Sequence, residues 1–252
     1  MLIKSFVFSL TLALSGAVLA DSKVGDEVVG QLQIGKRSFA LPPGKWTVVA
    51  ERESRGGQVN ESVSTNDKTQ YLVQIDGQSK FVSAATLSTT LSSIRVTNWN
   101  DSTCDRKDWL FTDKLDATMT HPACSFVNYS ANFWGGNNPK EEFDKTILSW
   151  YRDNKVVMPY NAVFTGYRKY FSSDYVRATF WFNPELVGLI DADKKPFAQS
   201  PWTIDNIKTD SARLAYIEQV KTWNQTMVKN SKATLMDGKP IDAGLPPMPG
   251  IN

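Results

Sequence analysis

The sequence is poor in the two side chains that most often bind metals or carry redox chemistry. It contains two cysteines, Cys104 and Cys124, and one histidine, His121. A His-Glu-x-x-His metalloprotease helix needs two histidines, and a thiol oxidoreductase needs two cysteines separated by two residues. Both classes are therefore excluded. The Gly-x-Ser-x-Gly elbow of many serine hydrolases is also absent. We assign no catalytic residue, no metal ligand and no cofactor from motifs.

Neither positive nor negative charge is in large excess. The 28 lysines and arginines nearly balance the 26 acidic residues, and the basic residues are scattered along the chain. A nucleic-acid-binding surface requires clustered positive charge, so nucleic acid is not an expected partner. Beyond the first residues no stretch approaches the ~18 consecutive apolar residues of a membrane-spanning helix. The sequence therefore predicts no transmembrane segment.

The N-terminus has the pattern of a secretory signal peptide. Lys4 supplies a positive charge, and Phe6 to Leu19 form an apolar run. In Val18-Leu19-Ala20, small residues occupy the minus-three and minus-one positions before Asp21. This pattern predicts cleavage near Ala20-Asp21 and a periplasmic or secreted protein. Residues 1–20 are then the signal peptide. We expect one globular domain over residues 21–236, with a sub-boundary near 100–125, and a tail rich in proline and glycine over 237–252.

Local patterns in the first half predict antiparallel β-structure. Pro42-Pro43-Gly44 predicts a turn between strands at 37–41 and 46–51. Asp76-Gly77, between Gln70–Ile75 and Ser79–Leu87, predicts a hairpin. The polar stretch Ser54 to Lys68 predicts an exposed loop.

The second half predicts two helices and a further hairpin. Asn137-Asn138-Pro139 precedes an apolar stripe that includes Trp150, which is typical of a helix start. Ala162–Phe171 and Tyr175–Phe182 predict two paired strands, and a helix is expected from Thr209 or Asp210 to about Asn230. The expected fold class is α+β, with an antiparallel β-rich N-terminal half, an aromatic-rich C-terminal half whose two helices pack on the sheet, and one disulfide.

The disulfide is predicted from the cysteine count. Two cysteines in an exported chain pair most economically with each other, so we expect a Cys104–Cys124 bond. Zinc held by both cysteines, His121 and a carboxylate such as Asp105 is an alternative, but oxidation of the cysteines would remove its ligands.

The single histidine allows two interpretations. His121 precedes Pro122, and a turn residue hydrogen-bonded to the backbone is the simpler account. The alternative is a general base, including one in a Ser-His-Asp arrangement, whose members need not be close in sequence.

Several acidic residues could serve as the catalytic carboxylates of a glycan hydrolase. Such an enzyme needs two carboxyl groups on either side of the scissile bond. Spacing in the sequence does not show that any two of the candidates converge, and a solvated polar loop is the competing interpretation. The candidates are Asp105, Asp108, Asp113, Asp116, Glu141 and Glu142.

Most aromatic residues lie between Trp99 and Phe182. Aromatic side chains are common in strands and cores, so packing accounts for many of them. A minority interpretation is an aromatic cleft for a small ligand, a glycan or an envelope protein. The ligand-binding candidates are Phe133, Trp134, Tyr167 and Tyr170.

Two segments and the cysteine pair carry a resemblance. Leu41 to Val49 (LPPGKWTVV) and Tyr175 to Leu189 (YVRATFWFNPELVGL) resemble a family of exported proteobacterial proteins without known activity. The resemblance implies a periplasmic location and no site residues.

The functional expectation follows from these patterns. Strand-rich architecture, many aromatic residues and one histidine fit a non-enzymatic periplasmic binding or interaction protein. The alternative is a carboxylate-dependent hydrolase acting on envelope glycans.

Overall fold

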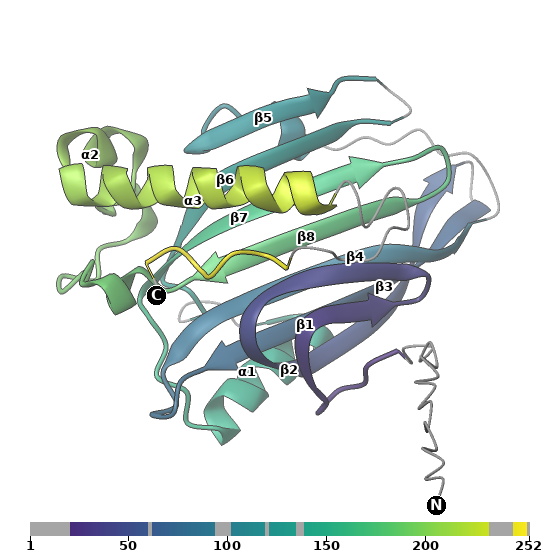
Figure 1. The fold of residues 1–252 in the computed structure, drawn as a ribbon, viewed down its shortest axis with the longest axis horizontal. Coiled ribbons are helices and arrows are strands. Elements are labelled where there is room, and N and C mark those ends of the chain that lie inside the picture. Colours follow the sequence, from purple (N-terminus) through teal and green to yellow (C-terminus); the bar gives the residue numbers. More distant parts are fainter. Residues whose placement is uncertain are drawn as a thin grey trace, which may run out of the picture.

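A computed structural model describes residues 21–59, 62–93, 102–118, 121–134, 139–231 and 244–250. Its centre is one antiparallel eight-stranded sheet with the strand order β1-β2-β3-β4-β8-β7-β6-β5 (Figure 1). Each half of the sheet is a meander of four strands, and the two meanders join where β4 pairs with β8. The strands are β1 (Glu27–Ile34), β2 (Arg37–Val59), β3 (Ser62–Ile75), β4 (Phe81–Ser93), β5 (Phe111–Asp116), β6 (Ala123–Ala131), β7 (Asn161–Tyr170) and β8 (Tyr175–Phe182).

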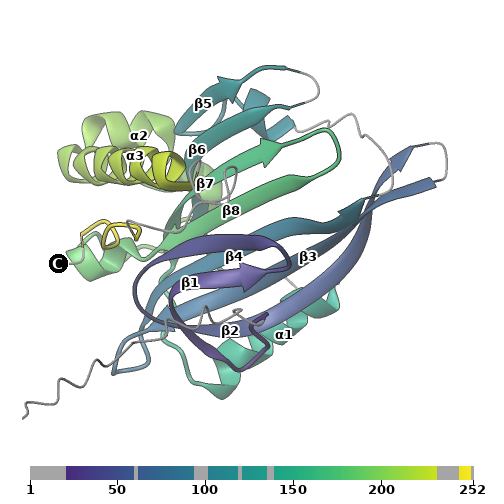
Figure 2. The same cartoon turned by 45° about the vertical axis from the view of Figure 1, so that its right-hand side comes forward.

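Helices cover both faces of the sheet. The long helix α3 (Ser211–Ser231) crosses one face over β6 and β7, and the short helix α2 (Ile204–Thr209) precedes it. Helix α1 (Glu142–Asp153) packs at β2 on the opposite face (Figures 1 and 2). Three 3₁₀ turns complete the described elements: η1 (Ser102–Asp105), η2 (Pro184–Val187) and η3 (Phe197–Gln199).

The core consists of two hydrophobic clusters, one on each face. Strand alternation separates them, because successive side chains of a strand point to opposite faces. On β8, Phe180 belongs to the cluster under α3, whereas Trp181 packs against the cluster under α1. Trp46 of β2 and Trp223 of α3 share the first cluster, which therefore connects both halves of the sheet.

The expected α+β class is wrong. The sheet does not end with the first half of the chain, since β5 to β8 continue it with four more strands. The second half is thus as rich in strands as the first, and its aromatic residues pack on both faces of one sheet. The predicted Cys104–Cys124 disulfide falls outside what the structure describes, although no free cysteine is found among the described residues. Cys124 is completely buried on β6, and the side chain of Cys104 lies outside the described part of the chain.

The predicted turn at Pro42-Pro43-Gly44 is also wrong. These residues lie inside β2, where the pairing with β1 shifts register opposite Gly30. Proline lacks an N–H group, so a β-bulge is one of the few places in a strand that tolerates it. The carbonyl of Pro42 instead accepts a hydrogen bond from the indole nitrogen of Trp46, at 3.0 Å.

The described part of the predicted loop from Ser54 to Lys68, which leaves out residues 60 and 61, belongs to paired strands. Ser54 pairs with Asp67 and Arg55 with Asn66 in the β2–β3 hairpin. Asp67 and Lys68 are buried despite their charges. The low apolar content of this stretch suggested a loop, but its polar side chains hydrogen-bond to one another within the sheet.

Predictions that depended on local signals are confirmed. Residues 76–80 connect β3 to β4, and the Asp76 carboxylate accepts hydrogen bonds from the backbone of Gln78 and Lys80, both at 2.8 Å. The hairpin of β7 and β8 lies where it is predicted, and the predicted apolar stripe that includes Trp150 forms the helix at 142–153.

The helix start predicted at Asn137-Asn138-Pro139 is wrong, because the N-cap of the helix is Glu141, which makes no side-chain cap hydrogen bond. Asn137 and Asn138 themselves lie outside the described residues, as does the expected strand beyond Ser93.

Helix α3 begins as the sequence predicts. The Asp210 carboxylate accepts hydrogen bonds from the backbone of Ala212 and Arg213, at 3.1 and 3.0 Å. Such a cap satisfies N–H groups that have no partner inside the helix. Residues 244–250 then lie against α3, where the Trp223 indole donates to the Pro246 carbonyl at 3.1 Å.

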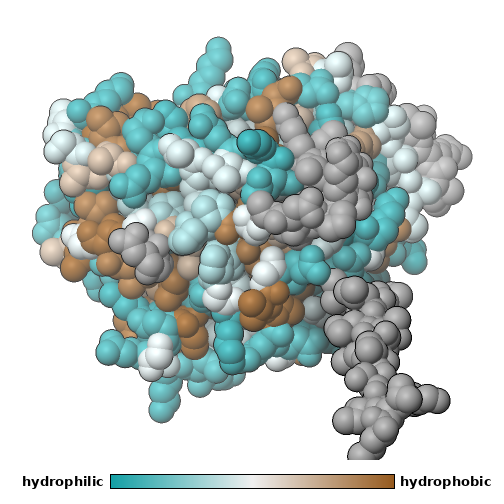
Figure 3. All heavy atoms as spheres, in the orientation of Figure 1, coloured by the Kyte–Doolittle hydropathy of each residue, from teal (hydrophilic) through white to brown (hydrophobic). Residues whose placement is uncertain are grey.

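The surface of the α3 face is mixed in polarity. In Figure 3, hydrophobic side chains form small groups among hydrophilic ones. Among the described helices, none is long and apolar enough to cross a bilayer.

Candidate functional site

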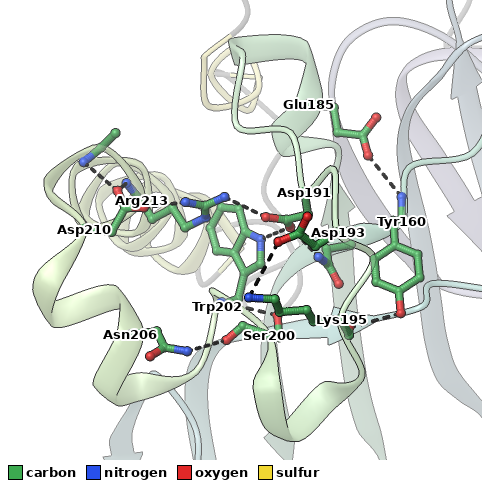
Figure 4. A network of polar contacts seen from close by, with 12 residues as sticks. Tyr160, Glu185, Asp191, Asp193, Lys195, Ser200, Trp202, Asn206, Asp210 and Arg213 are labelled. Atoms are coloured by element: carbon green, nitrogen blue, oxygen red, sulfur yellow. Dashed lines mark hydrogen bonds and ion pairs between the residues drawn. The ribbon is translucent and has the colours of Figure 1, made fainter.

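A hollow lies at the start of α3. It has a volume of about 780 Å³ and is bounded by the loop at 190–195, α2 and the first turn of α3. Figure 4 shows the polar network beneath it. Because charged side chains of both signs line this hollow, their availability to a ligand decides whether it can be a site.

Asp191 is the centre of this network. One carboxylate oxygen accepts from Arg213 at 2.6 Å, and the other accepts from the Trp202 indole at 2.7 Å and from Asn161 (Figure 4). Arg213 also bonds to Asp210. The Asp191 side chain is only 5% exposed, so its charge is compensated inside the protein.

This network is structural. It ties β7, the loop after η2, the segment before α2 and helix α3 together through one buried carboxylate. Farther out, Tyr160 donates to the Lys195 carbonyl at 3.0 Å and Asn206 to the Ser200 carbonyl at 2.9 Å, which fixes the rim (Figure 4). The aromatic side chain of the network, Trp202, is fully buried and offers no contact surface. The hollow therefore lacks the apolar lining of a typical ligand site.

A second hollow, which we call the sheet groove, lies on the α1 face of the sheet. Its volume of about 570 Å³ is in the range of small-molecule sites. Side chains that point to the same face of β2, β3, β4, β8, β7 and β6 form it, and Trp109 closes it from the segment before β5. The lining residues are Arg52, Ser54, Asp67, Thr69, Thr86, Ser88, Trp109, Phe126, Phe164, Arg168, Tyr175, Arg177, Thr179 and Trp181.

Two arginines in the sheet groove are held in fixed orientations. The Arg177 guanidinium lies 4.6 Å from the ring centre of Tyr175 and donates two hydrogen bonds to the Tyr170 hydroxyl, at 3.1 and 2.7 Å. The Arg168 guanidinium lies 5.4 Å from the ring centre of Phe126 and donates to the Thr103 hydroxyl at 2.6 Å. Guanidinium groups that are already oriented lose little side-chain entropy when they bind an anion.

Asp67 supplies the one carboxyl group among the lining residues described. The hydroxyls of Thr65 and Thr90 donate to its two oxygens, at 3.2 and 3.1 Å. Burial nevertheless raises the pKa of Asp67, and this effect outweighs the lowering by the threonine hydrogen bonds and by Arg177. Asp67 is therefore protonated more readily than an exposed carboxyl group, and three guanidinium groups line the same groove.

Aromatic rings form the walls of the sheet groove. Trp109 packs edge-on against Phe126 and Phe164, with ring centres 4.7 and 5.9 Å apart. The ring centre of Phe164 in turn lies 6.2 Å from that of Trp181. The groove thus combines positive charge with an apolar wall.

The four ligand-binding candidates from the sequence do not come together. Phe133 is buried and Trp134 is partly buried, and both pack near Tyr151 of α1. Tyr167 belongs to the cluster on the opposite face. Tyr170 lies beside the sheet groove, where its hydroxyl accepts from Arg177. Of the four, Tyr170 is therefore the one that touches a groove residue through a hydrogen bond.

The candidate carboxylates for a hydrolase lie apart on exposed surfaces. Asp105 pairs with Lys114 at 2.5 Å, and Asp108 pairs with Arg106, which lowers the pKa of Asp108. Asp113 is exposed on β5. The remaining three each have a lysine or arginine partner: Glu141 pairs with Arg52, Glu142 with Lys145, and Asp116 with Lys169.

His121 lies at neither hollow described above. Its Nε2 is 3.0 Å from the Ser172 hydroxyl, at the end of the β7–β8 hairpin. The backbone carbonyl of His121 accepts a hydrogen bond from the Lys169 ammonium group at 2.8 Å. Within the described ranges, no three His, Cys, Asp or Glu side chains are arranged to hold a metal ion.

The sequence patterns missed the groove arginines, although a signal for them exists. In Tyr175–Phe182 every second residue shares a face, which aligns Tyr175, Arg177, Thr179 and Trp181. This alternation predicts a polar and aromatic face on β8. It does not predict which neighbouring strands complete that face.

Comparisons with known proteins give no relative. No protein-family model, no curated protein and no solved structure matches the chain. The resemblance to exported proteobacterial proteins thus stays a prediction.

Proposed function

We propose that the chain is an exported binding protein, periplasmic or secreted, whose sheet groove holds a small organic anion with an apolar body. The observation that carries this proposal is the pair of groove arginines, Arg168 and Arg177, each fixed against an aromatic ring. An anionic group would bind between guanidinium groups, which match carboxylates, phosphates and sulfonates in geometry. The apolar body would lie against Trp109, Phe164 and Trp181.

The groove supports binding better than hydrolysis. Glycan hydrolysis by carboxylates needs two such groups, about 5 to 10 Å apart. The groove residues described supply one, Asp67. Of the carboxylates expected from the sequence none is a lining residue, and Glu141 meets the groove only through its exposed ion pair with Arg52. We therefore favour the binding function over the hydrolase alternative.

A fluorescent anion tests the proposal. The dye 8-anilinonaphthalene-1-sulfonate combines a sulfonate with aromatic rings, so it suits both parts of the groove. We expect saturable binding to the folded protein, and about tenfold weaker binding for Arg168→Gln and for Arg177→Gln, since a charge-assisted hydrogen bond contributes about 1.5–3 kcal/mol.

The matched control is Arg152→Gln. Arg152 is an exposed arginine on α1 that does not line the groove, so this variant should bind the dye as the wild type does. Thermal melts of every variant should show intact folding, because the dye also binds loosely packed states. Equal affinity of all four proteins for the dye would reject the groove as the anion site.

A further inference from the structure

The one histidine of the chain lies beside a serine in a separate hollow. His121 and Ser172 both line a space of about 300 Å³ at the end of the β7–β8 hairpin. The distance between His121 Nε2 and Ser172 Oγ is 3.0 Å, which is within the reach of a nucleophile and its general base. Both residues are half-buried, so the pair is open to solvent and to a small reactant.

The backbone on both sides of this pair is held in place. The Lys169 ammonium group donates to the His121 carbonyl and to Asp116, both at 2.8 Å. Next to the histidine, the Pro122 carbonyl accepts from the backbone of Tyr170 at 3.0 Å. On the serine side, Phe171 N donates to the Asp174 carbonyl at 2.7 Å and closes the hairpin around Ser172. A base and a nucleophile on two anchored segments keep their geometry without a ligand.

Positive charge lies in the same hollow. Lys36 and Arg37 line it together with Asp174, whose carboxylate pairs with them at 3.6 and 2.6 Å, so one positive charge is in excess. Arg37 is also held by the ring of Phe171, at 5.2 Å. Nucleophilic attack on a carbonyl places negative charge on its oxygen, and nearby fixed cations stabilise that charge. The small volume restricts the reactant to a short acyl group.

We propose that Ser172 is a nucleophile toward esters of short carboxylic acids, with His121 as its general base. With the imidazole proton on Nδ1, His121 Nε2 accepts the hydroxyl proton as Ser172 Oγ bonds to the ester carbonyl carbon. The tetrahedral intermediate then expels the alcohol, which takes that proton from His121. Water, deprotonated by the same imidazole, cleaves the acyl-serine, releases the carboxylic acid and restores the hydroxyl.

This activity is separate from the anion site. The hollow and the sheet groove are adjacent but distinct: Thr90 lines the hollow, and its hydroxyl bonds to Asp67 of the groove. Esterolysis therefore does not depend on the proposed groove function. Dye binding by the Ser172→Ala variant should match the wild type.

The experiment measures hydrolysis of p-nitrophenyl acetate and labelling by a fluorophosphonate. We expect the full-length protein to hydrolyse the ester, and both Ser172→Ala and His121→Gln to lower the rate by about 100-fold or more. Trypsin cleaves after Lys169 and Arg177, so mass spectrometry should find the phosphonyl adduct on the peptide of residues 170–177. Because that peptide also contains Ser173, the control is Ser173→Ala, which should keep both the rate and the adduct.

Three results would overturn the proposal. One is a wild type that neither hydrolyses the ester nor takes the label. Another is an adduct lost in Ser173→Ala and kept in Ser172→Ala. The last is hydrolysis that survives in Ser172→Ala and disappears in His121→Gln, which would show that the imidazole attacks the ester directly. Melting temperatures of the variants close to that of the wild type exclude misfolding as the cause of a lost rate.

Discussion

At the scale of single residues, Asp67 shows how a polar core is built inside the sheet. It is 6% exposed, and its neighbours Thr65 and Thr90 are also buried. The cost of burying the carboxyl is offset by the two threonine hydroxyls, yet burial still raises its pKa. The folded state thus holds the proton of Asp67 more tightly than the unfolded chain does.

This shift predicts how stability depends on pH. The contribution of a raised pKa is complete below the unfolded value of about 3.9 and is lost as the pH rises through the folded value. Asparagine stays neutral, so Asp67→Asn removes this dependence. We expect the unfolding free energy of the wild type, minus that of Asp67→Asn, to decrease as the pH rises from about 4 toward neutrality.

Urea unfolding at several pH values measures this difference. Asp205→Asn serves as the control, since the Asp205 side chain is 95% exposed and its replacement should leave the pH profile almost unchanged. A difference between wild type and Asp67→Asn that stays constant, or grows with pH, would contradict the burial argument.

The sequence shows which residues are unusual, but it does not show which neighbours surround each of them in the folded protein. Asp67 stands in a polar stretch that is typical of a loop, and only the pairing of β2, β3 and β4 buries it. His121 was identified by its rarity, whereas its partner Ser172 lies 51 residues away. The surroundings of Asp67 and of His121 could not be recognised from nearby residues in the sequence, because both include contacts between distant strands.

At the scale of elements, β7 depends on a glycine. Gly166 lies where its strand passes under the ring of Phe126, and its carbonyl accepts from the buried Asn224 of α3 at 3.0 Å. A Cβ atom at this position would lie 2.3 Å from the Phe126 ring and 2.8 Å from the Ala178 carbonyl oxygen. The ring can move, but the backbone oxygen cannot move without disturbing the β7–β8 pairing.

Gly166→Ala should therefore destabilise the protein by about 1–3 kcal/mol through overpacking. Displacement of the Phe126 ring should also weaken dye binding, because this ring supports Arg168 and Trp109 at the sheet groove. Chemical denaturation and dye titration measure the two effects. Gly77→Ala is the matched control, as a Cβ atom there would have no neighbour within 4 Å and the φ of Gly77 is not positive. Equal stability of the two variants would contradict the close approach.

Elements with a complete local signal could be predicted, and those without one could not. Asp210 caps α3, and Asp76 organises its turn, through contacts within four residues of each. Strand β6, by contrast, is buried on both faces and shows no alternation of polar and apolar residues. The bulge in β2 has the sequence pattern of a turn, because proline and glycine are common in both.

At the scale of the whole molecule, the two meanders meet along β4 and β8. Their register pairs Ser83 with Phe182 and Thr89 with Val176, residues that are far apart in the sequence. Strand order could not be predicted, since no local feature specifies a partner at that distance. Once the meanders join, Trp46 from the first packs against Phe180 from the second, with ring centres 6.4 Å apart.

This shared core predicts that both meanders unfold together. Trp223 of α3 packs edge-on against Phe180 and Phe182 of β8, at 5.2 and 5.0 Å, and its indole also anchors Pro246. Trp223→Ala should cost about 3–5 kcal/mol. Although Trp223 has ring contacts with β8, the loss should appear equally in the first meander, because the cluster under α3 includes residues of both.

Hydrogen exchange followed by mass spectrometry measures this coupling. In Trp223→Ala, peptides from β3 and from β7 should lose the same free energy of protection, whereas Gln225→Ala, at an exposed position of α3, should change neither. Loss of protection in β7 with β3 unchanged would mean that the meanders open separately along the β4–β8 seam. Equal loss would show that the sheet groove, which takes side chains from both meanders, exists only when the whole sheet is formed.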